Sequence, residues 1–343
     1  MNFRLILFPF SILYALITEV RNYLYDKGIL KSVAFDLPVI SVGNLNLGGS
    51  GKTPQIEYLI RLLQPDYKVA VISRGYKRLT KGFMAAEAQA TPASIGDEPY
   101  QIYRKFDDVL VAVGEDRVAA VKKVIDAYHP DVILLDDAFQ HRRIKAGLQI
   151  LLTPFDRPFY KDWLLPAGNL RELSKNARRA DLVVVTKLPK EVEFEKQQKV
   201  QKKIKKYAGN KAVYFSKIAY AGYITNDIVK ISMSDLKSYK ILLVTGIANP
   251  QPLYAFLSEK NINFESLKFG DHHRFSTTDI QRINKQYEDI KASKKLILTT
   301  EKDFVRLSSL LNDDVLFYLP IQTEIIDNEK FNNKIIDYVR NYK

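Results

Sequence analysis

A glycine-rich segment near the start of the chain has the residue types and spacing of a phosphate-binding loop. Residues 43–54 read Gly-Asn-Leu-Asn-Leu-Gly-Gly-Ser-Gly-Lys-Thr-Pro, directly after the apolar run at 37–42. Glycines let backbone N–H groups close around phosphate oxygens, and a helix that starts near Lys52 directs its positive end at the same anion. In such a loop Lys52 reaches the β- and γ-phosphates, and the Thr53 hydroxyl ligates Mg²⁺. The segment therefore predicts a nucleotide site.

One position departs from the strict loop pattern. That pattern has glycine five residues before Gly51, and this chain has Asn46 there, with other glycines nearby to supply flexibility. An incidental lysine in a glycine-rich turn is the alternative, but strand, loop and Gly-Lys-Thr follow each other in the order that the mechanism needs. The residues expected to bind ATP are Gly48, Gly49, Ser50, Gly51, Lys52, Thr53 and Pro54.

Pairs of acidic residues occur at two further turns. Residues 132–137 read Val-Ile-Leu-Leu-Asp-Asp, which predicts a buried strand with Asp136 and Asp137 at its tip. A nucleotide-hydrolysing sheet holds Mg²⁺ at this position, so either aspartate, together with the loop threonine, is a candidate ligand. Asp97 and Glu98 precede a helix, where a carboxylate can act as a general base or as an outer ligand of the metal. A polar loop and plain N-capping by Asp97 are the respective alternatives.

Cationic side chains follow several of the expected strands. Arg171 lies in the Pro/Gly-rich segment 165–172, where it could balance charge on a transferring phosphoryl group. Arg74 and Arg117 come just after strands and are candidates for binding an anionic substrate. Structural ion pairs are the alternative for all three arginines.

Two of the four histidines in the chain are adjacent. His272 and His273 lie in the segment 270–275, where an imidazole could cover the active site from across a cleft. Adjacent histidines rarely bind one ion together, and no other ligands follow at suitable spacing, so a metal site is not favoured there. His141 and Glu172 are supporting candidates for the substrate site.

Composition limits these interpretations. With 343 residues and 46% apolar content, the chain is long enough for about two domains. It has no cysteine, which excludes disulfides, zinc–thiolate sites and cysteine nucleophiles. The net charge of +13 favours an anionic partner, which can be a nucleotide, a nucleic acid or an acidic membrane surface.

The amino-terminal region predicts a membrane-associated helix. Residues 5–18 carry no charge, and a helix of that length spans about 21 Å, less than the ~30 Å hydrocarbon layer. We expect an interfacial helix, with a core helix and a true span as alternatives. A signal peptide is not favoured, because no small-x-small cleavage site follows. The lysine-rich stretch at 190–206 predicts a solvated helix or, alternatively, a basic face on acidic lipid.

Apolar runs alternate with helical patterns along the rest of the chain, which predicts an α/β fold. Strands of near-continuous Val, Ile and Leu separated by helices indicate a P-loop NTPase-like, mostly parallel sheet flanked by helices. Its expected strands are 39–42, 68–73, 109–113, 131–135, 148–153 and 182–186, and those of a second, smaller α/β domain are 213–219, 240–245, 295–300 and 315–319. The expected divisions are a membrane-associated helix at 1–30, a P-loop domain at 31–212, a smaller domain at 213–330 and a closing helix at 331–343.

Seven motifs together resemble the tetraacyldisaccharide 4'-kinase family of lipid A biosynthesis. They follow one another in the same order along nearly the whole chain, which makes the combination specific. The motifs are Gly48-Gly49-Ser50-Gly51-Lys52-Thr53-Pro54, Ser73-Arg74-Gly75-Tyr76, Gly96-Asp97-Glu98-Pro99, Asp136-Asp137-Ala138-Phe139-Gln140-His141, Pro166-Ala167-Gly168-Asn169-Leu170-Arg171-Glu172, Asp271-His272 and Thr300-Glu301-Lys302-Asp303. Ala138 and Asn169 depart from the family, in which glycine and proline are usual at these positions.

The resemblance implies an ATP-dependent lipid kinase. ATP, with Mg²⁺, would donate its γ-phosphoryl group to the 4'-hydroxyl of an acylated glucosamine disaccharide 1-phosphate. Asp97 would accept the hydroxyl proton, His272 would orient or tune it, and Arg171 would balance charge at the γ-phosphate. The resemblance also implies a peripheral enzyme on the cytoplasmic face of the inner membrane. Its partners would then be the glycolipid and the membrane surface, with no nucleic acid and no protein partner expected.

Three alternatives stay open on the residues alone. Residues 47–53 resemble the loop of membrane-associated ATPase switches of the partitioning type, although Leu47 stands where those proteins need a second lysine. A nucleic-acid-binding NTPase would fit the net charge, but no nucleic-acid-binding module is recognised. A nucleotide-binding scaffold without catalysis is the third.

Overall fold

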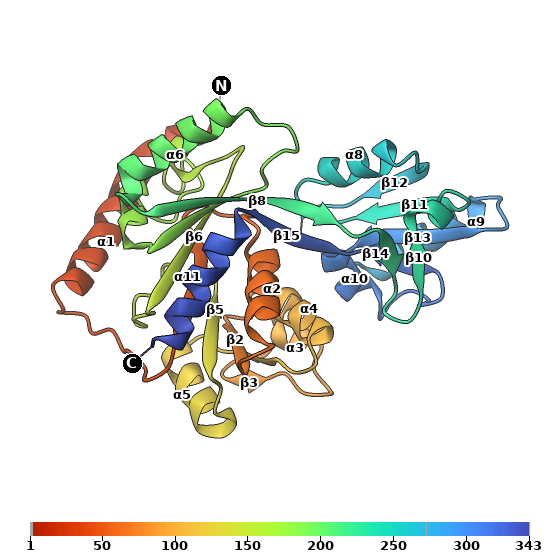
Figure 1. Ribbon diagram of the computed structural model, residues 1–343. Helices are drawn as coiled ribbons and strands as arrows, with labels where there is room; N and C mark the ends of the chain where they lie inside the picture. The colour runs from red at the N-terminus through yellow and green to blue at the C-terminus, as the bar shows by residue number, and fades with distance from the viewer. Residues whose placement is uncertain (1–2, 272, 343) are drawn as a thin grey trace.

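The computed structural model describes residues 3–271 and 273–342 and confirms the α/β fold. Within these residues a larger lobe surrounds a nine-stranded sheet and a smaller lobe surrounds a six-stranded sheet (Figure 1). The strands of the larger sheet, in spatial order, are β15 (Ile321–Ile326), β8 (Ala212–Tyr220), β7 (Leu182–Thr186), β6 (Leu148–Pro154), β1 (Val39–Asn44), β5 (Val132–Asp136), β2 (Val69–Ser73), β4 (Leu110–Val113) and β3 (Met84–Ala85). Neighbouring strands from β8 to β4 all run parallel, as expected.

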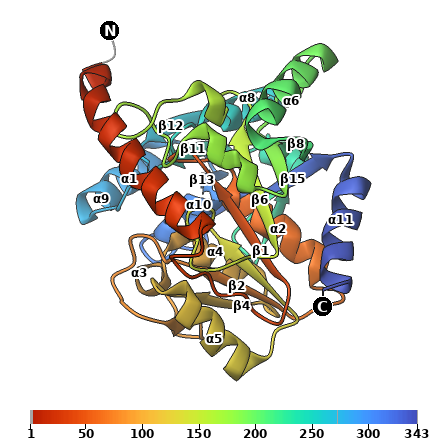
Figure 2. The same cartoon turned by 90° about the vertical axis from the view of Figure 1, so that its left-hand side faces the viewer.

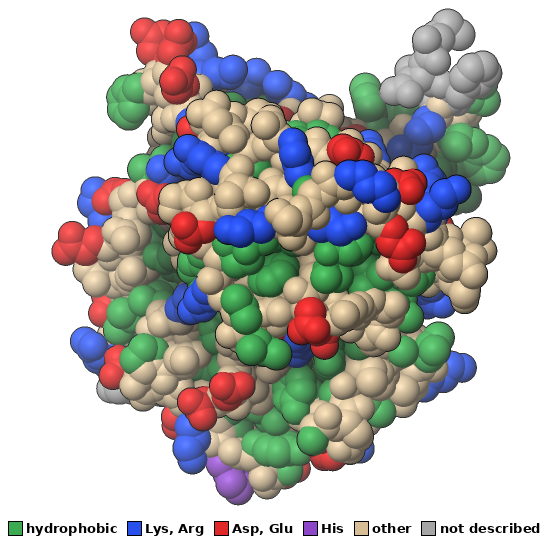
Figure 3. All heavy atoms as spheres, turned by 90° about the vertical axis from the view of Figure 1, so that its right-hand side faces the viewer, with side chains coloured by type: hydrophobic (Ala, Val, Ile, Leu, Met, Phe, Trp, Pro, Cys, Tyr) green, Lys and Arg blue, Asp and Glu red, His purple; other side chains and the backbone are tan. Residues whose placement is uncertain are grey.

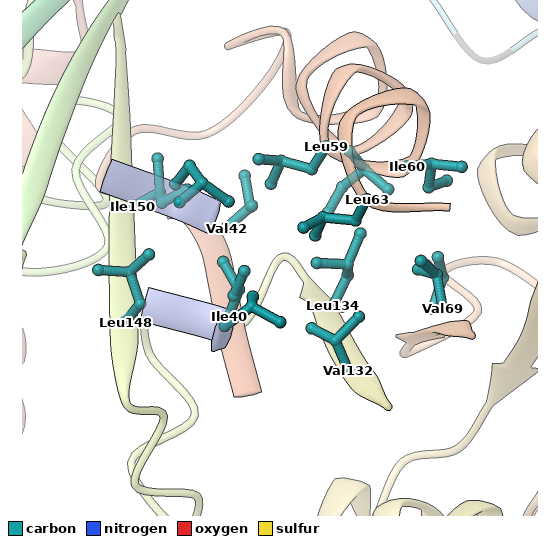
Figure 4. Close-up of a cluster of buried hydrophobic side chains, with 14 of the residues drawn as sticks. Ile40, Val42, Leu59, Ile60, Leu63, Val69, Val132, Leu134, Leu148 and Ile150 are labelled. Atoms are coloured by element: carbon teal, nitrogen blue, oxygen red, sulfur yellow. The ribbon is translucent and has the colours of Figure 1, made fainter. Parts of the chain in front are cut away.

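Helices cover both faces of the larger sheet because its central strands are apolar on both sides. On one face lie α2 (Lys52–Leu63), α4 (Asp97–Lys105) and α11 (Asn328–Arg340). On the other lie α5 (Arg117–Tyr128), α6 (Phe194–Ala208) and η3 (Ser174–Arg179). In Figure 4, Leu59 and Leu63 of α2 lie over Val42 and Leu134 of the sheet, within a cluster that is closed to solvent. This packing fixes the start of α2 relative to the end of β1, where the glycine-rich loop lies.

The smaller lobe is a second α/β unit. Its strands, in spatial order, are β10 (Lys230–Ser232), β9 (Tyr223–Thr225), β14 (Leu316–Leu319), β13 (Lys295–Thr300), β11 (Lys240–Thr245) and β12 (Phe264–Lys268). Its helices are α7 (Met233–Leu236), α8 (Gln251–Glu259), α9 (Thr277–Asp289) and α10 (Glu301–Leu307). Two further short elements, α3 (Pro92–Ile95) and η2 (Phe159–Lys161), lie in the larger lobe.

Two antiparallel strands connect the lobes. β8 pairs with β15 from Tyr220 opposite Ile321 to Phe215 opposite Ile326. The chain therefore leaves the larger lobe and returns to it through one ladder, and both of these strands belong to the larger sheet. By strand pairing the smaller sheet spans 223–319, which differs at both ends from the 213–330 expected from the sequence.

The amino-terminal segment forms η1 (Phe3–Leu7) and α1 (Phe8–Asp26), and α1 lies across the surface of the larger lobe (Figure 2). It is longer than the apolar run that predicted it. Its outward side is apolar, and the side chains that are more than half exposed include Phe10, Ile12, Leu13, Leu16 and Ile17. In the part of the chain that the structure describes, no helix combines the length and apolar character needed to span a bilayer.

The face that the smaller lobe presents carries mixed charge. In Figure 3, Lys and Arg side chains are interspersed with Asp and Glu side chains over this face. The net charge of +13 is therefore not gathered there into one extended basic patch.

Candidate active site

The glycine-rich segment forms a loop between β1 and α2, at the carboxyl edge of the parallel sheet. Gly48 and Gly51 adopt φ of +85° and +83°, in the left-handed region that glycine enters without strain. Gly51 is the N-cap of α2, so the helix begins at Lys52 with its free backbone N–H groups facing the loop. The residues expected to bind ATP therefore lie together in the geometry of a phosphate cradle.

Two positions at which the chain departs from expected patterns meet at one carboxylate. Asn46 Nδ2 donates to Asp162 Oδ2 at 3.1 Å. Asn169 donates to the same oxygen through Nδ2 at 3.1 Å, and to Asp162 Oδ1 through its backbone N–H at 3.2 Å. The backbone N–H of Leu47 also donates to Asn169 O at 2.7 Å. Asp162, which sequence reasoning missed, thus fixes the start of the loop where the usual glycine is replaced.

Asp136 lies at the end of β5 with almost no exposure to solvent. Ser73 Oγ donates to its Oδ2 at 3.4 Å, whereas its Oδ1 is buried without a hydrogen-bond partner. Burial raises the pKa of Asp136 to about 7, and Glu98 adds to this effect while Lys52 opposes it. A cation placed at this unpartnered oxygen stabilises the ionised form of the carboxylate.

Asp137 instead holds two cationic side chains. Its Oδ1 lies 3.8 Å from Lys52 Nζ and 2.8 Å from Arg171 Nη1. Burial acts to raise the pKa of Asp137, but Lys52 and Arg171 together lower it below its ordinary value. The structure therefore brings three of the expected site residues, from three separate segments of the chain, to one point beside the loop.

Arg117 supports this acidic turn from beneath. At the start of α5, its Nη2 donates to Asp136 O at 3.2 Å and to Asp137 O at 3.0 Å. Its side chain is buried, so the structure shows it bound to protein carbonyl oxygens, which is the structural alternative to contact with a substrate. Arg74 also lies where expected, after β2, and it is exposed.

His141 lies in the turn that follows the aspartate pair and is half-buried. Its Nε2 is buried and has no hydrogen-bond partner. Burial lowers the pKa of His141 to about 4, and Arg117 and Arg143 act in the same direction, so the ring is neutral at neutral pH. His141 lines a cavity of about 270 Å³. The other polar side chains that line this cavity are those of Ser32, Ser41, Arg142, Lys145, Gln149 and Arg179.

Glu172 joins α1 to the loop that carries Arg171. Its Oε2 accepts from Asn22 Nδ2 at 3.2 Å and lies 2.8 Å from Arg179 Nη2. Tyr14 Oη donates to Arg171 O at 3.0 Å. The observed contacts of Glu172 are therefore structural, and they hold the backbone that presents Arg171 against α1.

Asp97 and Glu98 form the first turn of α4 and face the smaller lobe. The N-cap of this helix is Gly96, with φ of +96°, so Asp97 does not cap it. Asp97 Oδ2 lies 3.2 Å from Arg306 Nε, and Glu98 Oε1 lies 3.4 Å from Lys302 Nζ. Both partners come from α10, which places Asp97 at the boundary between the lobes.

His272, the expected partner of Asp97, lies outside the described residues. The neighbouring His273 pairs with Asp279, with 2.9 Å between Nε2 and Oδ2. Its backbone oxygen accepts from Arg306 Nη1 at 3.0 Å. The sequence pointed to this segment but did not point to Arg306, because contacts between residues so far apart in the chain leave no local pattern.

Two further residues at the end of β7 contact the loop. Thr186 Oγ1 donates to Ser50 O at 2.8 Å, and Lys187 Nζ donates to Gly49 O at 2.6 Å. Burial lowers the pKa of Lys187. Sequence reasoning missed both, although they follow an expected strand at the edge where parallel sheets gather their ligand-binding loops.

The residues of the loop and acidic turn fit a nucleotide bound with magnesium. Over residues 3–271 and 273–342, no three acidic or histidine side chains gather into a metal cage. Mg²⁺ rarely uses such a cage, since it takes one or two carboxylates and completes its shell with phosphates and water. The buried, unpartnered oxygens of Asp136 and Ser50 are suited to such a bound group.

Comparison with known proteins covers nearly the full chain. The profile of the tetraacyldisaccharide-1-P 4'-kinase family matches residues 3–340. The tetraacyldisaccharide 4'-kinase of Flavobacterium johnsoniae is 48% identical to this chain, over 98% of this chain and 97% of its own length. That of Bacteroides thetaiotaomicron is 44% identical to this chain, over 97% of this chain and 93% of its own length. The crystal structure of LpxK from Aquifex aeolicus in complex with ATP is similar with a TM-score of 0.79 and 32% identity, over 98% of this chain and 99% of that one. The chain therefore belongs to the tetraacyldisaccharide-1-P 4'-kinase family.

Proposed function

We propose that this chain is an ATP-dependent kinase that phosphorylates the 4'-hydroxyl of a tetraacyldisaccharide 1-phosphate in lipid A biosynthesis. The observation that carries the proposal is the convergence of Lys52 and Arg171 on Asp137 beside the glycine-rich loop. Two cations held next to a phosphate cradle neutralise charge on a transferring phosphoryl group. The family match over residues 3–340 supports this reaction over an ATPase switch of the partitioning type.

We assign roles to the residues around the proposed nucleotide site on the basis of these contacts. Backbone N–H groups of residues 48–53 and the Lys52 ammonium bind the phosphates. Asp136 and Thr53 would hold Mg²⁺, which when bound neutralises charge shared by the β- and γ-phosphates. Asp137 orients Lys52 and Arg171, which it already pairs with, toward the phosphoryl group that is transferred.

The acceptor hydroxyl must lose a proton as its oxygen bonds to the γ-phosphorus and the bond from that phosphorus to ADP breaks. We assign this proton to the carboxylate of Asp97, and His272 stays the proposed partner that orients it. Arg74 and Glu98 are the remaining candidates for contact with the sugar phosphate headgroup.

The exposed face of α1 supports attachment to a membrane surface. A helix on a protein surface usually turns its apolar side inward, whereas α1 buries Ser11 and Asn22 and leaves its apolar side in solvent. Trp163 lies beside it, 57% exposed, with its ring 5.4 Å from that of Phe8, and tryptophan favours membrane interfaces. The lysine-rich α6 lies toward the same end of the molecule as the start of α1 (Figures 1 and 2). We propose a peripheral enzyme at the cytoplasmic face of the inner membrane, where an acylated substrate would lie.

Transfer of label from ATP tests the reaction directly. Purified protein is incubated with Mg²⁺, ATP radiolabelled at its γ-phosphate and acylated disaccharides in detergent. We expect label on the tetraacyldisaccharide 1-phosphate and none on an analogue that lacks the 4'-hydroxyl. Release of labelled inorganic phosphate at an equal rate with and without lipid, and no labelled lipid, would support the ATPase switch instead.

A further inference from the structure

We infer that Arg306 is a positioning residue for phosphoryl transfer, which reaches from the smaller lobe to hold the carboxylate of Asp97. The inference rests on the proposed function and adds to it a residue from the opposite side of the lobe boundary. Arg306 lies at the end of α10, and its side chain is 8% exposed. A guanidinium at this depth is ordered by its partners and is not a solvated surface group.

Each nitrogen of the Arg306 guanidinium lies near a different oxygen. Nε lies 3.2 Å from Asp97 Oδ2, Nη2 lies 3.2 Å from Asp303 Oδ1, and Nη1 donates to His273 O at 3.0 Å. The contacts of Nε and Nη2 are ion pairs without hydrogen-bond geometry, whereas the contact of Nη1 is a hydrogen bond. The rigid, planar guanidinium therefore holds the Asp97 and Asp303 carboxylates by charge while it is anchored through Nη1. Arg306 thus sets the position of Asp97 relative to the backbone directly after His272.

Asp303 holds Arg306 from behind. It is fully buried, and its Oδ2 accepts from Gly246 N and Thr300 Oγ1, both at 2.8 Å. The strand end at Thr300 and the turn after β11 therefore fix Asp303, and Asp303 fixes Arg306. This support leaves the guanidinium directed across the lobe boundary toward α4.

Arg306 differs from the other described ion pairs that cross this boundary. Arg104 pairs with Asp227 and Lys105 pairs with Glu301 at points away from Asp97, and Lys302 pairs with Glu98, the residue next to Asp97. Arg306 instead contacts the proposed base itself. A small misplacement of a reacting group is costly to rate, so a contact that aligns the base only when the lobes lie together couples their approach to catalysis.

A double-mutant cycle separates positioning from general adhesion of the lobes. The variants are Arg306→Gln, Arg306→Lys, Asp97→Asn and the double variant Asp97→Asn with Arg306→Gln. Arg104→Gln is the matched control, because it removes a guanidinium that joins the same two lobes elsewhere. Transfer of label from ATP to the tetraacyldisaccharide 1-phosphate gives kcat and KM, and a fluorescent ATP analogue reports nucleotide binding.

We expect Arg306→Gln to lower kcat about 10²-fold, the scale for a misplaced reacting group, and to leave the KM for ATP within about twofold. Arg306→Lys should recover part of the loss, because an ammonium can still reach Asp97. In the Asp97→Asn background, Arg306→Gln should cost less than about twofold, because Arg306 acts through Asp97. Arg104→Gln should keep kcat within about threefold.

Four results overturn the inference: Arg306→Gln with wild-type kcat, equal losses in Arg306→Gln and Arg104→Gln, no recovery in Arg306→Lys, or losses that multiply in the double variant. If Arg306→Gln does not fold, the cycle is run with Arg306→Lys, whose loss must likewise vanish in the Asp97→Asn background. If the wild type labels no lipid, the proposed function itself fails. A wild type that labels lipid alongside an unimpaired Arg306→Gln rejects the role of Arg306 alone.

Discussion

Lys52 Nζ and Asp137 Oδ1 lie 3.8 Å apart, so an ion pair joins the start of α2 to the turn after β5. Arg171 shares the same carboxylate oxygen at 2.8 Å. The pair is largely shielded from water, since the two side chains are 12% and 30% exposed. The carboxylate therefore holds both cations beside the glycine-rich loop.

Asp137→Asn should impair the chemical step more than nucleotide binding. The variant retains the loop but loses the charge that aims Lys52 and Arg171, and losing one such electrostatic element typically costs about 10²–10³-fold in kcat. Steady-state kinetics with label transfer to lipid measures kcat and the KM for ATP. Asp66→Asn, an exposed site in the turn after α2, is the control and should behave as wild type. Equal kcat in Asp137→Asn and Asp66→Asn would contradict the assignment.

Asp97→Ala should lower turnover by about 10²–10⁴-fold, the range for losing a general base. Binding of ATP should persist, because Asp97 lies on α4 and not in the glycine-rich loop. Asp107→Ala, an exposed change just beyond the same helix, serves as the control. Near-normal turnover in Asp97→Ala would remove this residue from the mechanism.

The free energy of unfolding of the nucleotide-free protein should carry a pH dependence that comes from Asp136. Burial raises its pKa from 3.8 to about 7, so the folded state keeps a proton that the unfolded chain has released. Its stabilising contribution is complete below pH 3.8 and is lost as pH rises to about 7. Asp136→Asn removes that loss, so the thermal midpoint of the variant minus that of wild type should be larger at about pH 8 than at about pH 5.

Two comparisons sharpen this measurement. Burial also raises the pKa of Glu301 to about 7, so the dependence that remains in Asp136→Asn should diminish further when Glu301→Gln is added. Mg²⁺ with ATP should narrow the difference in thermal midpoint between wild type and Asp136→Asn at high pH, because a nearby cation favours the ionised carboxylate. If the difference in thermal midpoint between variant and wild type is the same at both pH values, Asp136 is not the origin of the pH dependence of stability.

Leu13→Glu combined with Ile17→Glu should weaken binding to lipid vesicles. Both side chains are more than half exposed on α1, so the change should leave the fold intact while placing charge on its apolar face. Losing the burial of two aliphatic side chains in the interface should lower partitioning onto acidic phospholipid vesicles at least about tenfold, measured by co-sedimentation. Ile228→Glu, at a site 85% exposed in the smaller lobe, is the matched control. Equal partitioning of both variants would contradict an interfacial role for α1.

The strands of the larger sheet were predictable because each is a short apolar run between turn residues. β1, β5 and β7 are buried at every position, and such strands leave a continuous hydrophobic signal. The membership of β8 was not predictable in the same way. Its pairing with β15 joins segments about a hundred residues apart, and alternation within one strand does not tell which sheet it extends.

The residues of the candidate site likewise divide into those with a local sequence signal and those that depend on contacts between distant segments. Lys52, Asp136 and Asp137 stand out locally, because a glycine-rich loop and a strand tip each carry their chemistry in a few consecutive residues. Arg306 and Asp162 do not, since what matters about each is a partner brought near only by folding. Arg117 was predictable in part. Its position after a strand marked it as a candidate, but no local pattern predicted its contact with the carbonyl oxygens of the acidic turn.

The hydrogen bond from Tyr14 to the carbonyl oxygen of Arg171 holds α1 against the loop that carries Arg171. If α1 rests in the headgroup layer, only the thickness of one helix, about 10 Å, separates the lipid surface from the loop that carries Arg171. A sugar that projects from the leaflet can cross that gap while its acyl chains stay among their neighbours. The enzyme then has no need to extract its substrate, and two-dimensional diffusion within the membrane would supply it.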